Sequence, residues 1–457
     1  MRRPRAGLLW LALLALPALG PTTAAAAEAA PKATEGLKLT GSARVRYETI
    51  GNQPRTGLNK GDTLVAVRTG VTAEYDKGSV KVVGTLQDSR AYGANGGSPL
   101  STYDVNAVEL TEAYVQAGLR GPLGPDTTAT VQAGRFTMLL GSRRLIAGDD
   151  FRNTSNSYTG ARVDIAAPRA GLTATLVYTL PQVRLPDDIP SLLKNEIAFD
   201  RESNDLRLWG GIVTKTGLPF RTAADVTYLG LDERDFPGHP TRNRHLRTAD
   251  ARLIRDPAPG RFDFEFEGGY QYGTIRDSLS PIAVPLDVSA SYMHFEVGYS
   301  FAGAWRPRVE VDYDYASGDH GAASYGHFDT LLGSRRGDFS VPGLFFAIGR
   351  ANIISPGVHL ELTPNRRTDI LLHYEALWLA SRTDAFSFTG VRDPTGASGN
   401  FAGHDVDARV RYWLAQDRLR LEANAAYLIK GRFLKTAPDA PAGGNSSFLA
   451  LSLLATF

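Results

Sequence analysis

The sequence has 457 residues and a net charge of +2, so its overall charge points to no particular class of partner. The absence of cysteine excludes a disulfide framework, a thiolate zinc site and a cysteine nucleophile. A hydrophobic content of 43% excludes a disordered chain, and the lack of repeated 20-residue apolar runs excludes a polytopic helical membrane protein. The 47 Gly, 18 Tyr and 20 Phe favour an all-β chain with many turns.

Residues 1–27 have the pattern of a secretory signal peptide. Arginines in the first five residues precede an apolar stretch over 6–20, and the small residues Ala25 and Ala27 follow. The apolar stretch contains Pro17 and is too short for a membrane helix. We therefore predict cleavage after Ala27, a short flexible segment over 28–37, and a single domain over 38–457.

From Leu39 onward, apolar and polar residues alternate with the period of β-strands. Between 262 and 267, for example, phenylalanines occupy one face of the expected strand and acids the other. The strands are about 10 to 14 residues long, the length of tilted membrane strands, and charges of both signs on the polar face suit a water-filled lumen. Aromatic residues recur near strand ends, where a membrane barrel places its interface girdle.

The pattern predicts an all-β fold: a single transmembrane antiparallel barrel of about 18 strands, with 16 as the alternative count. Short periplasmic turns are expected at 76–78, 256–260 and 416–417. Long extracellular loops are expected at 91–106, 181–204, 232–246, 277–288, 317–349 and 383–403. The last strand ends on Phe457, similar to the insertion signal of bacterial outer-membrane barrels, and should close the barrel against the first strand.

Three stretches resemble the alginate-export family of outer-membrane barrels. The first is AGRFTMLLGSRRLIAGDDFRNTSNSYTGARV over 133–163, where Phe151 stands at the family's Trp position and Thr159 at its Asp position. The second is DYDYASGDHG over 312–321 with FDTLL over 328–332, and the third is GHDVD over 403–407 with KGRF over 430–433. The resemblance implies an 18-stranded barrel, an arginine-rich lumen and passage of a polyuronate through the outer membrane.

Inward-facing arginines are the candidate selectivity residues, because rings of Arg or Lys select anions. Arg135, Arg152, Arg409 and Arg411 match the positions of lumen arginines in the family motifs, whereas Arg46 and Arg68 are assigned from alternation. The alternative is that lumen acids tie up each arginine and make the wall rigid. The candidate acids are Glu74, Glu112, Asp405 and Asp407.

Two loop motifs leave other readings open. Arg143-Arg144 and Asp149-Asp150 could form a constriction, but we expect a solvated loop. Residues 317–320, with His327 and Asp329, match no metal-binding spacing, so we predict a folded loop that narrows or gates the pore, and no metal site.

We predict no enzymatic activity and no cofactor. No G-x-S-x-G motif occurs, and the neighbours His404 and Asp405 point to opposite faces of a strand. Basic residues are interleaved with acids, which disfavours nucleic-acid binding.

The predicted function is an outer-membrane channel for anionic solutes, most specifically the export of an alginate-like acidic exopolysaccharide. The alternatives are a porin for uptake of small anionic or amphipathic solutes, and a plugged structural or ligand-binding barrel. The expected partners are the anionic polysaccharide or small anions, outer-membrane lipid, the barrel-insertion machinery and periplasmic export-scaffold proteins.

Overall fold

The computed structural model describes residues 36–457 except 149–150, 322–323, 335–337 and 340–342. The predicted signal peptide lies outside the described residues, as does Asp149-Asp150. Strand β1 begins at Gly36.

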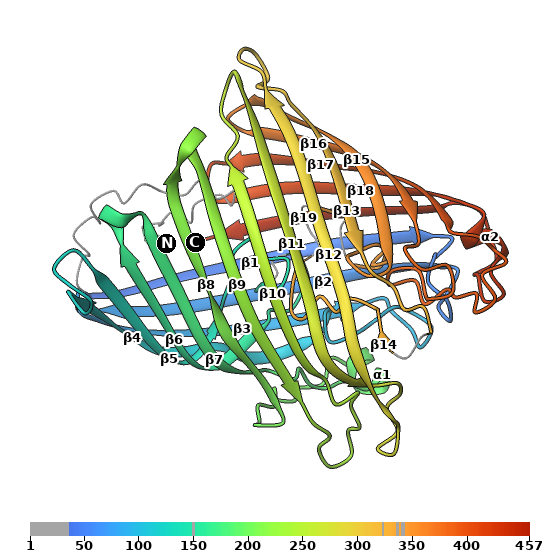
Figure 1. The fold of residues 1–457 in the computed structure, drawn as a ribbon, viewed down its shortest axis with the longest axis horizontal. Helices are drawn as coiled ribbons and strands as arrows, with labels where there is room; N and C mark the ends of the chain where they lie inside the picture. The colour runs from blue at the N-terminus through green and yellow to red at the C-terminus, as the bar shows by residue number, and fades with distance from the viewer. Residues whose placement is uncertain (1–35, 149–150, 322–323, 335–337, 340–342) are drawn as a thin grey trace, which may run out of the picture.

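The described residues form one sheet (Figure 1). Its first strands are β1 (Gly36–Gly51), β2 (Gly61–Asp76), β3 (Val80–Tyr92), β4 (Asn106–Arg120), β5 (Thr128–Thr137), β6 (Ser157–Ala167), β7 (Leu172–Pro181), β8 (Leu206–Leu218), β9 (Thr222–Glu233) and β10 (His245–Arg255). The others are β11 (Arg261–Arg276), β12 (Pro285–Ser300), β13 (Arg308–Ala316), β14 (Ser324–Tyr325), β15 (Ile353–Asn365), β16 (Thr368–Trp378), β17 (Phe401–Ala415), β18 (Leu419–Lys430) and β19 (Ser446–Thr456). The short helices are α1 (Ile189–Leu193), α2 (Phe433–Thr436), η1 (Pro168–Ala170) and η2 (Pro219–Arg221).

Eighteen long strands pair antiparallel with their neighbours and close into a barrel, which confirms the predicted fold class. The two-residue β14 is an addition that pairs parallel to β12. Within the described residues, no helix is both long enough and apolar enough to cross a bilayer.

The barrel closes where β19 pairs with β1, from Ser42 opposite Thr456 to Gly51 opposite Ser447. Beyond the ladder, the amide of Gly41 donates to the carbonyl of Phe457 over 2.6 Å, and the amide of Phe457 donates back over 2.9 Å. A Cβ at residue 41 would lie 2.5 Å from the Phe457 ring. Glycine at this position therefore leaves room for the terminal ring to pack over the end of the β1–β19 ladder.

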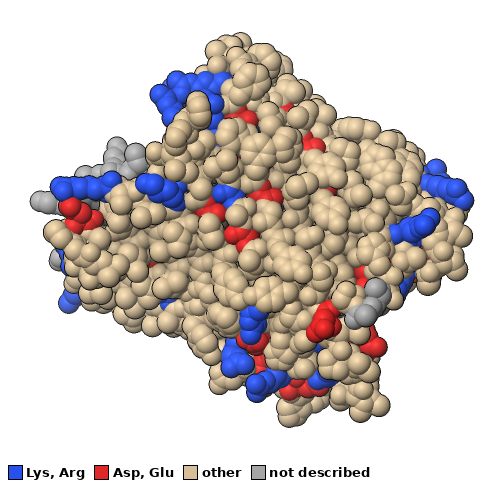
Figure 2. Space-filling view, in the orientation of Figure 1, with Lys and Arg blue, Asp and Glu red and all other residues tan. Residues whose placement is uncertain are grey.

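The two faces of the sheet follow the alternation of the sequence. On β19, Leu449, Leu451 and Leu453 are exposed on the outer face, whereas Phe448 and Ala450 are buried inside. Figure 2 shows the same division over a wider area: most of the visible face lacks charge, and the charged side chains gather mainly toward the strand ends. An apolar outer band of this kind suits contact with lipid.

The connections have two lengths, as predicted. One end of the barrel has short turns, such as that after β2, where the amide of Gly78 donates to Asp76 over 2.7 Å and glycine adopts a φ of 77°. The other end has the long loops, including two that were not predicted, at 52–60 and 431–445, and the loop expected around Arg143-Arg144, which spans 138–156.

Two of the long loops pair with each other inside the barrel. In the β5–β6 loop (138–156), the amide of Ala147 donates to Leu332 over 3.0 Å, and the amide of Leu332 in turn donates to Leu145 over 3.1 Å. Leu332 belongs to the β13–β15 segment (317–352), which therefore narrows the lumen as expected. Their apolar residues form a buried core with the inner wall that includes Met138, Leu140, Leu145, Ile146, Phe151, Phe328, Leu344, Phe345 and Ile348.

Candidate functional site

A basic hollow lies inside the barrel where the first and last strands meet. The space between its lining atoms, open solvent included, is about 370 Å³. It is lined by Arg44 and Arg46 of β1, Arg68 of β2, Arg420 and Glu422 of β18, Ser452 and Leu454 of β19, and Phe151 of the β5–β6 loop. Closure of the barrel creates this site, because β18 and β19 come from the other end of the chain.

The strand arginines in this hollow hold the β5–β6 loop. Arg46 is 1% exposed, bonds Glu48 through Nε at 2.6 Å, donates to the Phe151 carbonyl, and lies 4.2 Å from the Phe151 ring centroid. Arg44 and Arg68 both donate to the carbonyl of Arg152, over 2.7 and 3.2 Å. Three predicted residues, Arg46, Arg68 and Arg152, therefore come together here, and Arg44 and Arg420 join them.

Arg152 itself points away from the carbonyl that these arginines hold. Its guanidinium lies 3.8 Å from the ring centroid of Tyr103 in the β3–β4 loop, at cation–π distance. Arg152 is 7% exposed, so this contact links two loops within the lumen.

The other predicted arginines lie elsewhere on the wall. Arg411 binds both oxygens of Asp369 through Nε, at 2.8 and 2.9 Å, and Arg409 lies 3.8 Å from the same carboxylate. Arg135 pairs with Glu109 at 2.5 Å and with Glu202 at 3.4 Å. The acids in contact with the predicted arginines thus include Glu48, Glu109, Glu202 and Asp369, none of which was a candidate from the sequence.

The four candidate acids have the following surroundings. Glu74 pairs with Lys81 at 3.1 Å, and Glu112 accepts hydrogen bonds from Thr85 and Thr137 at 2.7 and 2.9 Å. Asp407 lies 3.0 Å from Nδ1 of His373, and Asp405 is completely buried. Alternation placed these acids on the inner face, but their partners depend on strand register.

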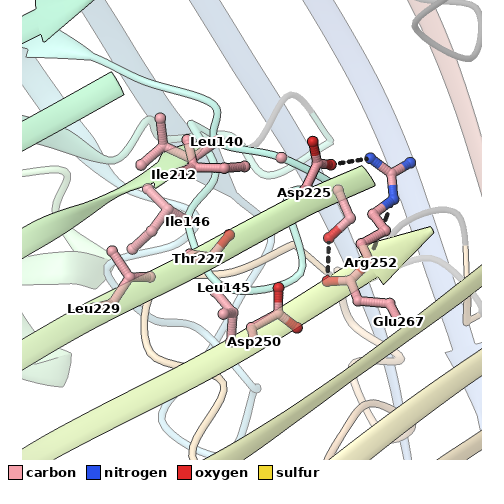
Figure 3. Close-up of a pocket in the computed structure, with 12 residues that line it drawn as sticks. Leu140, Leu145, Ile146, Ile212, Asp225, Thr227, Leu229, Asp250, Arg252 and Glu267 are labelled. Carbon is pink, nitrogen blue, oxygen red and sulfur yellow. Dashed lines mark hydrogen bonds and ion pairs between the residues drawn. The ribbon is translucent and has the colours of Figure 1, made fainter. Parts of the chain in front are cut away.

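A second, smaller hollow lies under the β5–β6 loop on the opposite wall. The space between its lining atoms, open solvent included, is about 280 Å³. Figure 3 shows Leu140, Leu145 and Ile146 of the loop on one side and the polar side chains of the wall on the other. Arg252 pairs there with Asp225 at 3.1 Å.

Arg144 pins the loop to this wall, which corrects the expectation of a solvated Arg143-Arg144 loop. The side chain is 5% exposed and pairs with Glu265 and, at 2.5 Å, with Glu267, both on β11. It also binds Asp338 of the β13–β15 segment through two bonds of 2.8 and 2.9 Å. The apolar neighbours in LLGSRRLIAG (139–148) draw the loop inward, and they were the available sequence signal.

Electrostatics reinforce this contact. Burial lowers the pKa of Arg144, but Asp338, Glu265 and Glu267 outweigh burial and raise the pKa well above its usual value. In the β3–β4 and β7–β8 loops, burial and a nearby acid raise the pKa values of Asp104 and Asp200 to about 6.

Comparison with known proteins identifies the chain's relatives. The sequence profile of a family described as alginate export matches residues 36–444. The chain belongs to the alginate-export family. No curated protein matches the sequence.

Solved structures of porins share the fold. OccAB1 of Acinetobacter baumannii superimposes with a TM-score of 0.57 and 13% identity, covering 94% of this chain and 99% of that one. OccK2 of Pseudomonas aeruginosa in complex with glucuronate superimposes with a TM-score of 0.55 and 12% identity, covering 93% of this chain and 99% of that one. OpdK of the same organism with vanillate has a TM-score of 0.53 and 13% identity, and the match covers 92% of this chain and 98% of that one. Family membership and this fold make the protein an outer-membrane channel of the alginate-export family.

Proposed function

We propose that this channel exports an acidic exopolysaccharide, an alginate-like polyuronate, and that inward arginines select the polymer. The observation that carries the proposal is the basic hollow beside a lumen narrowed by the two paired loops, because its lining includes four arginines and one acid. Fixed positive charge in a narrow passage with low-dielectric walls concentrates anions. A guanidinium also matches the planar geometry of each uronate carboxylate.

A polymer channel must also release each carboxylate. Arg409 and Arg411 share Asp369, so a uronate reaching them exchanges with a carboxylate that is already bound. Exchange of one carboxylate for another gives a smaller net gain than capture by an unpaired arginine, which keeps each contact weak. The proposed selectivity residues are Arg46, Arg68, Arg135, Arg152, Arg409 and Arg411, with Glu74, Glu112, Asp405 and Asp407 keeping the wall rigid.

Uptake of small anionic or amphipathic solutes is the second candidate, and the inward loops favour it. Their pairing and buried core narrow the lumen, which suits a small solute. OccK2 in complex with glucuronate and OpdK with vanillate show that barrels of this fold can bind small carboxylates, which supports this candidate.

The two candidates differ in their response to chain length. In a planar bilayer under a KCl gradient, the reversal potential should show anion preference in both cases. Oligouronates of increasing length should block an exporter more deeply, because several weak contacts act in series. Block that does not change with length favours the uptake porin, whereas cation preference or no current contradicts both candidates.

Substitutions locate the selectivity. The pair Arg409→Ser and Arg411→Ser, and the pair Arg68→Ser and Arg420→Ser, should each reduce anion preference in a folded barrel. The double variant Arg169→Ser/Arg221→Ser is the charge-matched control, because both arginines lie in short turns and are exposed, the Arg169 side chain by 82%. Selectivity equal to the control in both double variants would contradict the proposed role.

The proposal also covers delivery and assembly. The signal peptide is removed after Ala27, and the barrel-insertion machinery recognises the final strand through Phe457. For polymer export, periplasmic scaffold proteins bring the chain to the short-turn end of the barrel.

A further inference from the structure

Three neighbouring strands bring two histidines and an aspartate together on the inner wall, outside the basic hollow. His359 of β15 lies directly opposite His373 of β16 in the strand register. Asp312 of β13 lies opposite Gly357, two residues before His359, so it is the diagonal neighbour of that histidine. All three side chains are buried, with exposures of 6% for Asp312 and 4% for each histidine.

The atoms that face one another are those that can bind a metal. One ligand atom from each residue lies within 4.8 Å of the others. Nε2 of His373 is 3.9 Å from Oδ1 of Asp312, and the two imidazole centroids are 3.7 Å apart. Among the described residues, these Nε2 atoms and Oδ1 of Asp312 are buried without a hydrogen-bond partner. Three such atoms side by side are costly unless something binds them.

The outer nitrogen of each histidine is held by a carboxylate. Nδ1 of His359 lies 2.9 Å from Glu310, and Nδ1 of His373 lies 3.0 Å from Asp407. A carboxylate that accepts from Nδ1–H fixes the tautomer in which Nε2 carries the lone pair, as at metal centres where a second carboxylate orients the histidine.

The backbone leaves space between the ligands. A Cβ at Gly357 would lie 2.6 and 2.7 Å from the two oxygens of Asp312 and 2.9 Å from Nε2 of His373. Any larger residue at this position would therefore enter the volume that the three ligand atoms face.

We propose that Asp312, His359 and His373 bind a divalent transition-metal ion of the Zn²⁺ class. Two imidazoles and one carboxylate suit such ions better than Ca²⁺ or Mg²⁺, which prefer oxygen ligands. Bonds of about 2.0 to 2.2 Å place tetrahedral ligand atoms about 3.3 to 3.6 Å apart, so the side chains close in slightly around the ion. The ion cross-links β13, β15 and β16 and leaves one coordination position for water.

A second histidine group provides a contrast. His294, Asp314 and Asp338 also lie close together, but Asp338 is already bound by Arg144 and Arg350. The arginines supply the charge that a metal would supply, so this group is not expected to bind the ion.

The test uses untagged full-length mature barrel, refolded in detergent, stripped with EDTA and equilibrated with Zn²⁺. We expect one tightly bound zinc per chain by elemental analysis, and X-ray absorption with two imidazoles and an oxygen shell. His359→Gln, His373→Gln and Gly357→Ala should each weaken zinc binding at least about tenfold. Control His404→Gln, next to Tyr374 at 2.9 Å on a neighbouring strand, should bind like the native chain.

Folding of each variant is checked by the heat-dependent mobility of the barrel on a gel. If the ligand variants fail to fold, the X-ray absorption spectrum of the native chain still tests the proposal, because it shows whether two imidazoles bind the zinc. An all-oxygen shell, no zinc above that in a buffer blank, or equal binding by a folded His359→Gln/His373→Gln variant would overturn the proposal. These results are independent of whether the channel exports a polymer or takes up small solutes.

Discussion

Replacing Arg144 by methionine should release the β5–β6 loop from the barrel wall. Arg144 is the cation shared by Glu265, Glu267 and Asp338, and methionine keeps most of its length without its charge. Removing one partner of a buried ion pair costs about 3–5 kcal/mol, because the remaining charges stay buried. At about 1.4 kcal/mol per tenfold change, the undocked loop should become more populated by a factor on the order of 10² to several times 10³.

Apolar contacts determine whether the loop leaves completely. Leu145 and Ile146 are 5% and 0% exposed, and burial of each contributes about 1.5–3 kcal/mol. This contribution is similar in size to the loss at Arg144. The loop should therefore remain docked most of the time but open far more often, giving larger and noisier single-channel currents.

Hydrogen exchange of amides 140–147, together with single-channel conductance, measures this effect. Arg143→Met is the matched control, because it removes the same charge from the neighbouring position. Adding Glu265→Gln and Glu267→Gln to Arg144→Met should restore part of the protection, because it removes two buried acids that then share only Arg252 as a cation. Exchange and conductance equal to those of the Arg143→Met control would refute the pinning role.

Three further predictions concern other parts of the barrel. Because burial raises the pKa values of Asp104 and Asp200 to about 6, above an unfolded value of about 3.9, their stabilising contribution is complete below pH 4 and is lost as pH rises through 6. The protection factors of amides in 93–105 and 182–205, which correct for the intrinsic pH dependence of hydrogen exchange, should therefore be higher at pH 5 than at pH 7, with a smaller difference in Asp104→Asn. Gly160→Ala should lower the refolding yield, because its Cβ would lie 2.2 Å from a backbone carbonyl, whereas Gly118→Ala, with open space around it, should refold normally. Phe457→Ser should reduce the amount in the outer membrane of cells but not refolding in detergent; equal loss in both would contradict recognition by the insertion machinery.

The barrel could be predicted because lipid and water impose opposite demands on successive residues of a strand. The phenylalanines at 262–266 face outward, and Asp263, Glu265 and Glu267 face inward, as the alternation requires. The closing strand was recognisable for the same reason, since Leu449, Leu451 and Leu453 share the outer face.

The contacts inside the lumen were less accessible to sequence reasoning. Alternation assigns a side chain to a face, but it does not show which residue of the next strand lies opposite. Arg411 was placed in the lumen, yet its partner Asp369 follows only from the pairing of β16 with β17. Likewise, alternation assigns His373 to one face of its strand, but only the pairing of β15 with β16 places it opposite His359.

Arg144 illustrates the remaining gap, because its acidic partners lie 121 to 194 residues away in sequence. Adjacent polar residues suggested a solvated loop. The neighbouring leucines and Ile146 instead determine where the loop lies, because a loop that carries such apolar side chains lowers its free energy by folding into the barrel mouth.

The arrangement of charge across the lumen then favours a path for the solute. In a ring of 18 long strands, β10 lies nine places from β1, so the basic hollow and the acidic wall around β11 face each other. Arg144 and Arg252 offset the acids of that wall, and a metal ion at Asp312, His359 and His373 would offset more of the acids farther along the ring. A passing anion is attracted by Arg68 and Arg420 and is repelled by the acids of the opposite wall, where Glu265 and Glu267 share Arg144 and Arg252. The solute should therefore follow the strands where the barrel closes, and substitutions on β1, β2 and β18 should change selectivity more than equal changes in charge on β11.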